Sequence, residues 1–354
     1  MGSPNVDDVL TSLRPRPRPV PVLSALLAVL ALVASACSSS GSGGAAAPSN
    51  GVVTGHPGVE SSAGSSAPVV SESASAPVSE SASKSEKPKK PVHIRLINSD
   101  GSTYGVGMPV IAFFSGKIKD AKPLQDATTV TINGHKAQGA WYFEPSSYYE
   151  GYPIEAHFRL ENFWPAHASI HVDIPTKGLS AGGNLAYDDS LTLDFSTGPR
   201  NIATVDDSTH KMTVVSDGKN YGTFPVSLGA DDPQTRTFNG TKVIMEQVKT
   251  VCMQDVRGTY HECGIKWDQR VTYSGEYLHA APWNVSNIQK GVDSSNGCTN
   301  LLPDDAVKLY HFLRVGDVVE YPNANGPAMT MGAGYGDWNV SWGEWQTGGL
   351  VPTT

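Results

Sequence analysis

Apolar and polar positions alternate with a period of two along most of the chain after residue 91, which is the pattern of half-buried β-strands. In the first part, Gly, Pro and Asn residues separate the alternating runs at the spacing typical of an antiparallel sandwich. The strands expected there are 92–97, 110–114, 128–132, 155–160, 169–174 and 190–195. We predict a β-sandwich over residues 92–200, without an acid, base or metal cluster, that serves as a spacer or docking module.

The same alternation continues into a second β-rich domain, predicted over residues 201–325, with one or two short helices. Residues 303–313 form the convincing helix, because Pro303 and two acids open it and Val307, Tyr310 and Leu313 recur at helical spacing. Three tryptophans follow at 338, 342 and 345. We expect segment 326–354 to pack on the second domain, with a sugar-stacking platform as the alternative. The expected strands are 212–216, 222–229, 241–248, 264–273 and 317–321.

The first 37 residues have the layout of a secretory signal. Three arginines precede the apolar run 20–36, and small residues lead into Cys37. Val33-Ala-Ser-Ala-Cys37 resembles a bacterial lipobox, although Ala34 stands where Leu or Val is usual. We predict a lipoprotein signal peptide over 1–37, with Cys37 as the lipidation site; plain secretion and a retained membrane anchor are the alternatives. Each version places the remaining chain outside the cytoplasm.

Residues 38–91 are rich in Ser, Ala, Gly and Pro and contain almost no large apolar residue. Such a segment cannot bury enough surface to offset its ordering entropy, so we predict a disordered linker. Coil scaling gives it a reach of about 40 Å.

Composition supports a mainly β protein and excludes one class of partner. The 354 residues include 36 Gly and 25 Pro and carry a net charge of −8. Many turn formers with few charged residues favour β architecture over long helices. The acidic balance, without a Lys/Arg stripe, argues against a nucleic-acid surface.

The candidate chemistry lies in one stretch of the second domain, at His279 and Cys298. A thiolate is the reactive form of cysteine, and a nearby histidine can accept the thiol proton. Gly297 allows the backbone to turn so that successive N–H groups converge on an oxyanion. The alternative from composition alone is an inert buried thiol and an unrelated core histidine.

The order of these residues favours the first interpretation. His279 is followed by the 15 residues 280–294 and then by Ser295-Asn-Gly-Cys-Thr-Asn300. This arrangement resembles the signature of the L,D-transpeptidase catalytic domain of mycobacterial type. The resemblance extends over about residues 92–350 and implies an Ig-like domain in place of the plain sandwich at 92–200.

The resemblance implies a role for each matching residue. Cys298 would attack a meso-diaminopimelate carbonyl in a tetrapeptide stem and expel D-Ala, with His279 as general base. The carbonyl of Ala280 would orient the imidazole, and the amides of Gly297 and Cys298 would hold the oxyanion. The predicted substrate contacts are Trp283, Ser295, Asn300 and, from a hairpin that covers the site, Tyr260 and His261. Asn296 replaces the usual family histidine, so we expect an active enzyme with altered rate or drug sensitivity.

Cys252 and Cys263 flank the tip of that hairpin. A two-residue turn at Arg257-Gly258 would place them opposite each other. Because this would be a hydrogen-bonded pair, the less favourable setting for a bridge, the sequence leaves the disulfide open. A zinc site at His261 and Cys263 lacks a second pair of ligands, so we expect no metal ion.

The sequence therefore predicts an enzyme that needs no cofactor and forms 3→3 cross-links between peptidoglycan stem peptides. The donor would be a tetrapeptide and the acceptor the side-chain amine of meso-diaminopimelate. Carbapenem β-lactams would inhibit it, and a lipid anchor would hold it on the membrane facing the cell wall. An L,D-carboxypeptidase and a weakly active or non-catalytic wall-binding homologue are the alternatives.

Overall fold

A computed structural model describes residues 89–146, 149–254 and 261–354. The predicted signal peptide, Cys37 and most of the predicted linker lie outside these residues. Strand β1 begins at Lys90, so the last two residues of the predicted linker belong to a sheet. Among the helices in the described ranges, none has both the length and the apolarity that a membrane crossing requires.

The first module is a sandwich of two mainly antiparallel sheets, as the alternation predicts, and β3 is the exception because it pairs with β11 in parallel. One sheet has the strand order β2-β4-β8-β7 and the other the order β3-β11-β9-β5-β6, while β1 and β10 form a small parallel pair. Its elements are β1 (Lys90–Val92), β2 (Ile94–Leu96), β3 (Thr103–Tyr104), β4 (Val110–Phe114), α2 (Lys122–Ala127), β5 (Thr129–Ile132), β6 (His135–Ala137), β7 (Ala140–Pro145), β8 (Ile154–Arg159), β9 (Ser169–Ile174), β10 (Leu185–Tyr187) and β11 (Leu191–Thr197).

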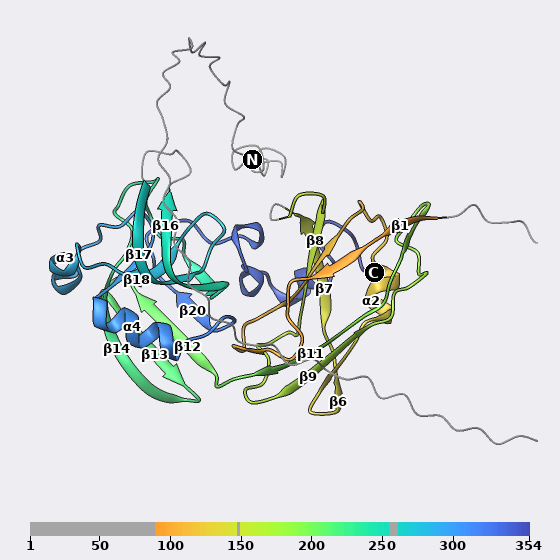
Figure 1. The fold of residues 1–354 in the computed structure, drawn as a ribbon, viewed down its shortest axis with the longest axis horizontal. Helices are drawn as coiled ribbons and strands as arrows, with labels where there is room; N and C mark the ends of the chain where they lie inside the picture. Colours follow the sequence, from red (N-terminus) through yellow and green to blue (C-terminus); the bar gives the residue numbers. More distant parts are fainter. Residues whose placement is uncertain (1–88, 147–148, 255–260) are drawn as a thin grey trace, which may run out of the picture. The chain divides into compact units, whose positions relative to one another are not determined.

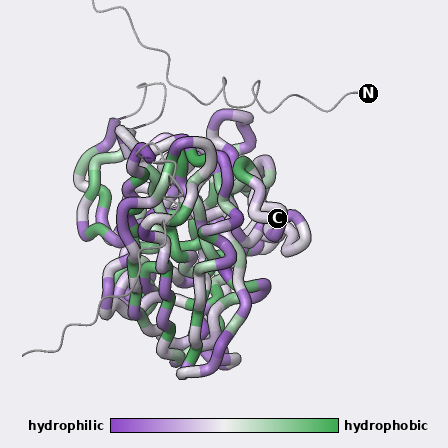
Figure 2. The backbone as a smooth tube through the Cα atoms, turned by 90° about the vertical axis from the view of Figure 1, so that its right-hand side faces the viewer, coloured by the Kyte–Doolittle hydropathy of each residue, from purple (hydrophilic) through white to green (hydrophobic). Residues whose placement is uncertain are grey.

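The space between these two sheets is filled by alternate residues of each strand. Trp141 and Phe158 pack at a ring separation of 5.3 Å, and Val172 and Phe195 face them from the other sheet. The indole N–H of Trp141 donates to Thr128 Oγ1 at 2.9 Å, so its polar atom is satisfied within the apolar core. Figure 2 shows the resulting change between hydrophobic and hydrophilic residues along the backbone.

The second module is built on one nine-stranded sheet of order β15-β20-β12-β13-β14-β19-β18-β17-β16. Most neighbours are antiparallel, but β12–β20 and β18–β19 are parallel pairs. Its elements are β12 (Asn201–Asp206), β13 (Lys211–Ser216), β14 (Lys219–Ser227), β15 (Gly240–Val243), β16 (Glu246–Gln254), β17 (His261–Arg270), β18 (Tyr277–Ala280), α3 (Val285–Lys290), β19 (Thr299–Leu301), α4 (Pro303–Phe312) and β20 (Val318–Tyr321).

Helix α4 lies on one face of this sheet (Figure 1) and begins at Pro303, as predicted. Its buried face is formed by Ala306 and Leu309, followed by Leu313 just after the last turn. Val307 and Tyr310, whose spacing indicated the helix, are half-buried. The mainly β fold, an Ig-like sandwich followed by a β-rich domain with two short helices, is confirmed.

The C-terminal segment contacts the second module, where the sequence analysis expected it, and the first module as well. Asn339 makes two hydrogen bonds with the backbone of Thr241, at 2.8 and 2.7 Å. Further along, Trp345 stacks on Tyr142 at 4.9 Å and donates its indole N–H to the carbonyl of Ala140 at 2.8 Å. The short helices of this segment are η1 (Met331–Ala333), η2 (Asp337–Asn339) and α5 (Trp342–Trp345).

The tail is held there because the outer face of β7 and β8 carries large side chains that need cover. The guanidinium of Arg159 lies 4.2 Å from the ring centre of Trp345 and donates to the carbonyl of Val340 at 2.7 Å. A cation over an indole ring is attracted to it electrostatically, and the alkyl stem of the arginine adds apolar contact. In Figure 1 the dark blue end of the chain accordingly lies beside β7 and β8.

The same outer face brings together a buried group of acids and a histidine, which the sequence analysis did not expect in residues 92–200. Glu144 and Glu155 are direct cross-strand neighbours, and His157 follows two residues along β8 on the same face. The Nδ1 atom of His157 lies 2.9 Å from Asp337 of η2. Burial raises the pKa of Glu144 well above its usual range. Burial opposes charge on His157, but Asp337 and Glu155 outweigh it and raise the pKa of the imidazole to about 10.

Candidate active site

Two parallel strands at the centre of the second module position Cys298 and His279. Strand β18 pairs with β19 so that Leu278 lies opposite Thr299 and His279 opposite Asn300, and Cys298 comes directly before β19. Side chains alternate between the faces of a sheet. Leu278 and Ala280 point into the core, so His279 and Cys298 emerge together on the opposite face.

The thiol of Cys298 is buried among apolar side chains of the neighbouring strands. Met253, Ile265 and Tyr277 pack around it, and 8% of the residue is exposed. The thiol donates to the carbonyl of Gly275 at 3.7 Å. Burial raises its pKa to about 12, and the carboxylates of Glu276 and Asp268 act in the same direction. The resting nucleophile is therefore a neutral thiol.

His279 is held in the tautomer that a general base needs. Its Nδ1 lies 2.9 Å from the carbonyl oxygen of Ala280. A carbonyl only accepts hydrogen bonds, so Nδ1 carries the proton and Nε2 retains a lone pair. Burial lowers the pKa of His279 to about 4, which keeps the ring neutral at pH 7. The ring of Trp283, 58% exposed, stacks near it with centres 5.8 Å apart.

The loop before Cys298 is fixed by side-chain bonds to its own backbone. Gly297 has a φ of 112°, a conformation that other residues rarely adopt. Ser295 Oγ donates to the carbonyl of Cys298 at 2.6 Å and accepts from the amide of Gly297 at 3.1 Å. Thr237 Oγ1 donates to the carbonyl of Gly297 at 2.9 Å. The Gly297 amide must therefore exchange Ser295 Oγ for an oxyanion if it is to stabilise one.

A buried ion pair lies behind the nucleophile, and the sequence analysis missed it. Lys242 Nζ lies 2.6 Å from Glu276 Oε2, with side chains 0% and 8% exposed. The other carboxylate oxygen accepts from the amide of Phe238 at 2.7 Å, and the ammonium lies 3.8 Å from the ring centre of Tyr321. Burial lowers the pKa of Lys242 and raises that of Glu276, while each charge counteracts this for its partner. Nothing in the alternating strand around Lys242 distinguishes it from a surface lysine.

Two asparagines of the motif have opposite surroundings. Asn300 is 3% exposed, lies opposite His279 in the strand register, and its Oδ1 meets no hydrogen-bond donor within the part of the chain that the structure describes. A buried acceptor of this kind is costly unless something binds it. Asn296, in contrast, is exposed at the surface of the loop.

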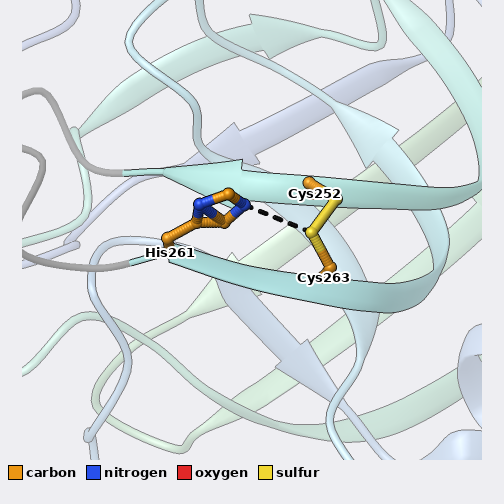
Figure 3. A group of neighbouring side chains, drawn as sticks. All are labelled: Cys252, His261 and Cys263. Atoms are coloured by element: carbon orange, nitrogen blue, oxygen red, sulfur yellow. Dashed lines mark hydrogen bonds between the residues drawn. A yellow bond between two sulfur atoms is a disulfide. The ribbon is translucent and has the colours of Figure 1, made fainter. Parts of the chain in front are cut away.

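The hairpin of β16 and β17 has the register that the sequence predicted, and it covers the nucleophile. Gln254 pairs with His261 and Cys252 with Cys263. Figure 3 shows the disulfide that joins the two cysteines, with His261 Nε2 at 3.2 Å from Cys263 Sγ. All three residues are exposed. Tyr260 lies outside the described residues, and substrate contact by His261 stays a prediction.

Comparison with known proteins gives a match for each of the two modules. Residues 200–320 match the sequence model of the L,D-transpeptidase catalytic domain, and residues 65–180 match that of a bacterial Ig domain. The chain is 30% identical over 270 residues to L,D-transpeptidase 2 of Mycobacterium tuberculosis, covering 73% of this chain and 63% of the relative. For L,D-transpeptidase 5 of the same species the identity is 29% over 266 residues, covering 75% and 58%. The chain thus spans less than two thirds of the length of these two relatives.

Solved structures of L,D-transpeptidases are similar to this chain in fold. LD transpeptidase LdtMt1 in complex with imipenem superimposes with a TM-score of 0.51 and 26% identity, covering 64% of this chain and 97% of that one. An L,D-transpeptidase from Mycobacterium smegmatis gives a TM-score of 0.51 and 26% identity, covering 66% and 100%.

Proposed function

The chain carries an L,D-transpeptidase catalytic domain behind a bacterial Ig domain, and from this premise we propose that it is a peptidoglycan L,D-transpeptidase that forms 3→3 cross-links. The observation that carries the proposal is that Cys298 and His279 lie on the same face of the sheet, at the parallel pair of β18 and β19. The neutral imidazole, with Nδ1–H bound to Ala280, leaves Nε2 to take the thiol proton.

In the proposed acylation one proton moves from Cys298 to His279 and then to the leaving group, so none is lost. As the donor tetrapeptide binds, the proton of Cys298 passes to His279 Nε2, and the sulfur attacks the carbonyl of the L-centre of meso-diaminopimelate. The amides of Gly297 and Cys298 stabilise the oxyanion. The bond to D-Ala then breaks, and the imidazolium returns its proton to the leaving amine, which leaves a thioester on Cys298.

The second half-reaction regenerates the thiol. The side-chain amine of an acceptor meso-diaminopimelate attacks the thioester and loses a proton to His279, and the imidazolium protonates the departing sulfur. The buried Oδ1 of Asn300 and the exposed ring of Trp283 border His279 and supply one polar and one apolar contact for the stem peptides. The neutral resting thiol means that substrate binding, rather than the free enzyme, drives formation of the thiolate.

Asn296 should alter the rate of this chemistry and not its kind. Its side chain is exposed, so it is not needed to hold the loop, which Ser295 and Thr237 fix. An amide cannot shuttle protons near neutral pH but can donate and accept hydrogen bonds. Replacing it with histidine, the family residue, is expected to change the acylation rate without changing the melting temperature.

Acylation by a carbapenem, followed by intact mass spectrometry, tests the nucleophile. We expect one adduct on the wild-type protein and none on Cys298→Ala, since Cys252 and Cys263 are tied in a disulfide under non-reducing conditions. The His279→Gln variant should acylate far more slowly. An unmodified wild-type mass after prolonged exposure would refute the acyl-enzyme.

A second assay separates transpeptidation from trimming. The protein is incubated with tetrapeptide stems, and the products are separated by mass. Cross-linked dimers with one D-Ala lost indicate the transpeptidase, whereas tripeptide alone indicates an L,D-carboxypeptidase. Normal cell-wall phenotypes in a Cys298→Ala strain would instead indicate a non-catalytic wall-binding protein.

We also propose that the enzyme acts outside the cytoplasm and is anchored through a diacylated Cys37. The support is the sequence layout of residues 1–37. Metabolic labelling with a fatty-acid analogue should tag the wild-type protein but not Cys37→Ala. Equal labelling of both would contradict the anchor.

A further inference from the structure

We propose that Glu144, Glu155 and His157 form a binding site for one divalent transition-metal cation, of the zinc class, between the Ig-like sheet and the C-terminal segment. The three residues come from adjacent strands of one sheet, β7 and β8, and project from the same face. One ligand atom from each lies within 4.8 Å of the other two. The site is remote in sequence from the catalytic motif and is independent of the proposed reaction.

The spacing of the ligand atoms fits a metal ion. Glu155 Oε1 and His157 Nε2 are 3.4 Å apart. Two ligands that each lie about 2.1 Å from a zinc ion at a tetrahedral angle are about 3.4 Å from each other. Glu144 stands directly across the strand pair from Glu155 and supplies the third ligand.

The imidazole is oriented as in metal sites. His157 Nδ1 lies 2.9 and 3.1 Å from the two oxygens of Asp337, so Nδ1 donates to this carboxylate and Nε2 is directed towards the glutamates. Metal-binding histidines commonly donate their second ring N–H to a carboxylate in this way, which fixes the ring and raises its basicity. Asp337 would therefore be a positioning residue for the site.

Three polar atoms of the group lack a hydrogen bond although they are buried. These atoms are Glu144 Oε1, Glu155 Oε2 and His157 Nε2; none makes a hydrogen bond within the residues that the structure describes, although Nε2 lies 3.4 Å from Glu155 Oε1. The three residues are 8%, 1% and 0% exposed. Buried groups of this type are normally paired or bound to a metal. A cation bound to all three would satisfy them together.

The surrounding charges also favour a cation. Three carboxylates, those of Glu144, Glu155 and Asp337, lie around one imidazole, while the guanidinium of Arg159 on the same sheet face lies over the ring of Trp345. The hydroxyl-bearing rings of Tyr273 and Tyr335 complete the walls and add no positive charge. Imidazole with two carboxylates suits zinc or manganese, whereas calcium prefers six or more oxygens.

Metal binding to the purified full-length protein tests the site. Every variant is made in a Cys298→Ala background, so that the catalytic thiol cannot bind metal, and is first stripped with a chelator. Native mass spectrometry should show one zinc ion retained by the Cys298→Ala protein. We expect the ion to be lost in Glu144→Gln and Glu155→Gln. Asp337→Asn should bind it about 10- to 100-fold more weakly, as expected for a residue that orients a ligand.

A matched control addresses a competing cluster. Asp207, His210 and Asp293 also lie close enough to hold an ion, so His210→Gln should retain zinc with unchanged affinity. Cobalt(II) substituted into the site should show visible bands of nitrogen and oxygen ligation, without the near-ultraviolet thiolate band. Because this spectrum is recorded on the Cys298→Ala protein itself, it tests the ligands even if a glutamine variant fails to fold. Binding that survives in both glutamine variants, or that disappears in His210→Gln, would overturn the proposal, as would a stripped protein that takes up no ion.

Discussion

Replacing Glu276 with glutamine should destabilise the protein strongly and at the same time activate the thiol of Cys298. The change removes the partner of Lys242, whose side chain is 0% exposed and whose ammonium lies 2.6 Å from the carboxylate. Removing one member of a buried pair typically costs about 3–5 kcal/mol, because the other charge is left without compensation. The lysine can avoid this only by losing its proton, which costs about 5 kcal/mol at pH 7. The ring of Tyr321, 3.8 Å from the ammonium, offsets about 2 kcal/mol of this cost.

The effect on the thiol follows from the signs of the two charges. Glu276 raises the pKa of Cys298 and Lys242 lowers it. The Glu276→Gln variant should therefore have a lower thiol pKa than the wild type, and Lys242→Met a higher one. Each unit by which the pKa falls gives roughly tenfold more thiolate at a fixed pH below the pKa.

A double-mutant cycle provides the measurement. Urea unfolding gives the free energy of unfolding for the wild type, for each single variant and for the double variant Lys242→Met/Glu276→Gln, in which both charges are absent. We expect the double variant to lose less stability than Glu276→Gln alone, since no unpaired charge remains buried. Alkylation of Cys298, followed as a function of pH by peptide mass spectrometry, reports the thiol pKa. Additive losses of stability, or a thiol pKa that is the same in both single variants, would refute the reasoning.

Three further predictions concern the same domain. Replacing Cys252 and Cys263 with serine opens a loop with a sequence separation of 11. The greater chain entropy of the unfolded state should lower the free energy of unfolding by about 3 kcal/mol and the melting temperature by several degrees. An unchanged melting temperature would contradict this. The folded-state pKa of His279, about 4, lies below the unfolded value of about 6.5, so the unfolded chain binds more protons between these values and stability falls as the pH falls through this window. Urea unfolding at pH 4 and 7 should show a loss of about 3 kcal/mol from this group that His279→Gln lacks. Gly297→Ala has room for its Cβ, whose nearest neighbour is 3.6 Å away, but a φ of 112° strains it, so we expect a loss of about 1–3 kcal/mol and much slower acylation; acylation at the wild-type rate would show that the turn is not required.

The sequence predicted the features that depend on local pattern. Alternation located most strands, and the turn between Cys252 and Cys263 set a hairpin register that the structure reproduces. The motif order, through its resemblance to the family, predicted one site for His279 and Cys298, and the parallel pair of β18 and β19 brings the two residues to one face of the sheet. The strands and the hairpin register rest on periodicity and spacing, which a single sequence displays directly, whereas the catalytic roles stay a prediction.

Features that depend on two distant segments meeting could not be predicted. Lys242 and Glu276 are 34 positions apart, and neither differs from an ordinary surface charge until both are buried. His157 and Asp337 are separated by 180 positions. The tryptophans of the tail correctly indicated packing, but the partner surface depends on Arg159 and Tyr142, which belong to the other module. The identity of such partners is a property of the tertiary fold.

The contact between the C-terminal segment and the first module determines the order in which the two modules can be completed during synthesis. Val351 is 4% exposed and belongs to the hydrophobic core of the Ig-like sandwich, and Leu350 donates its amide to the carbonyl of Phe143 in β7. The residues that complete the first module therefore leave the ribosome only after the whole of the second module. Until these residues emerge, the first module lacks part of its core and the cover of β7, so the sandwich is completed only after the second module has been synthesised.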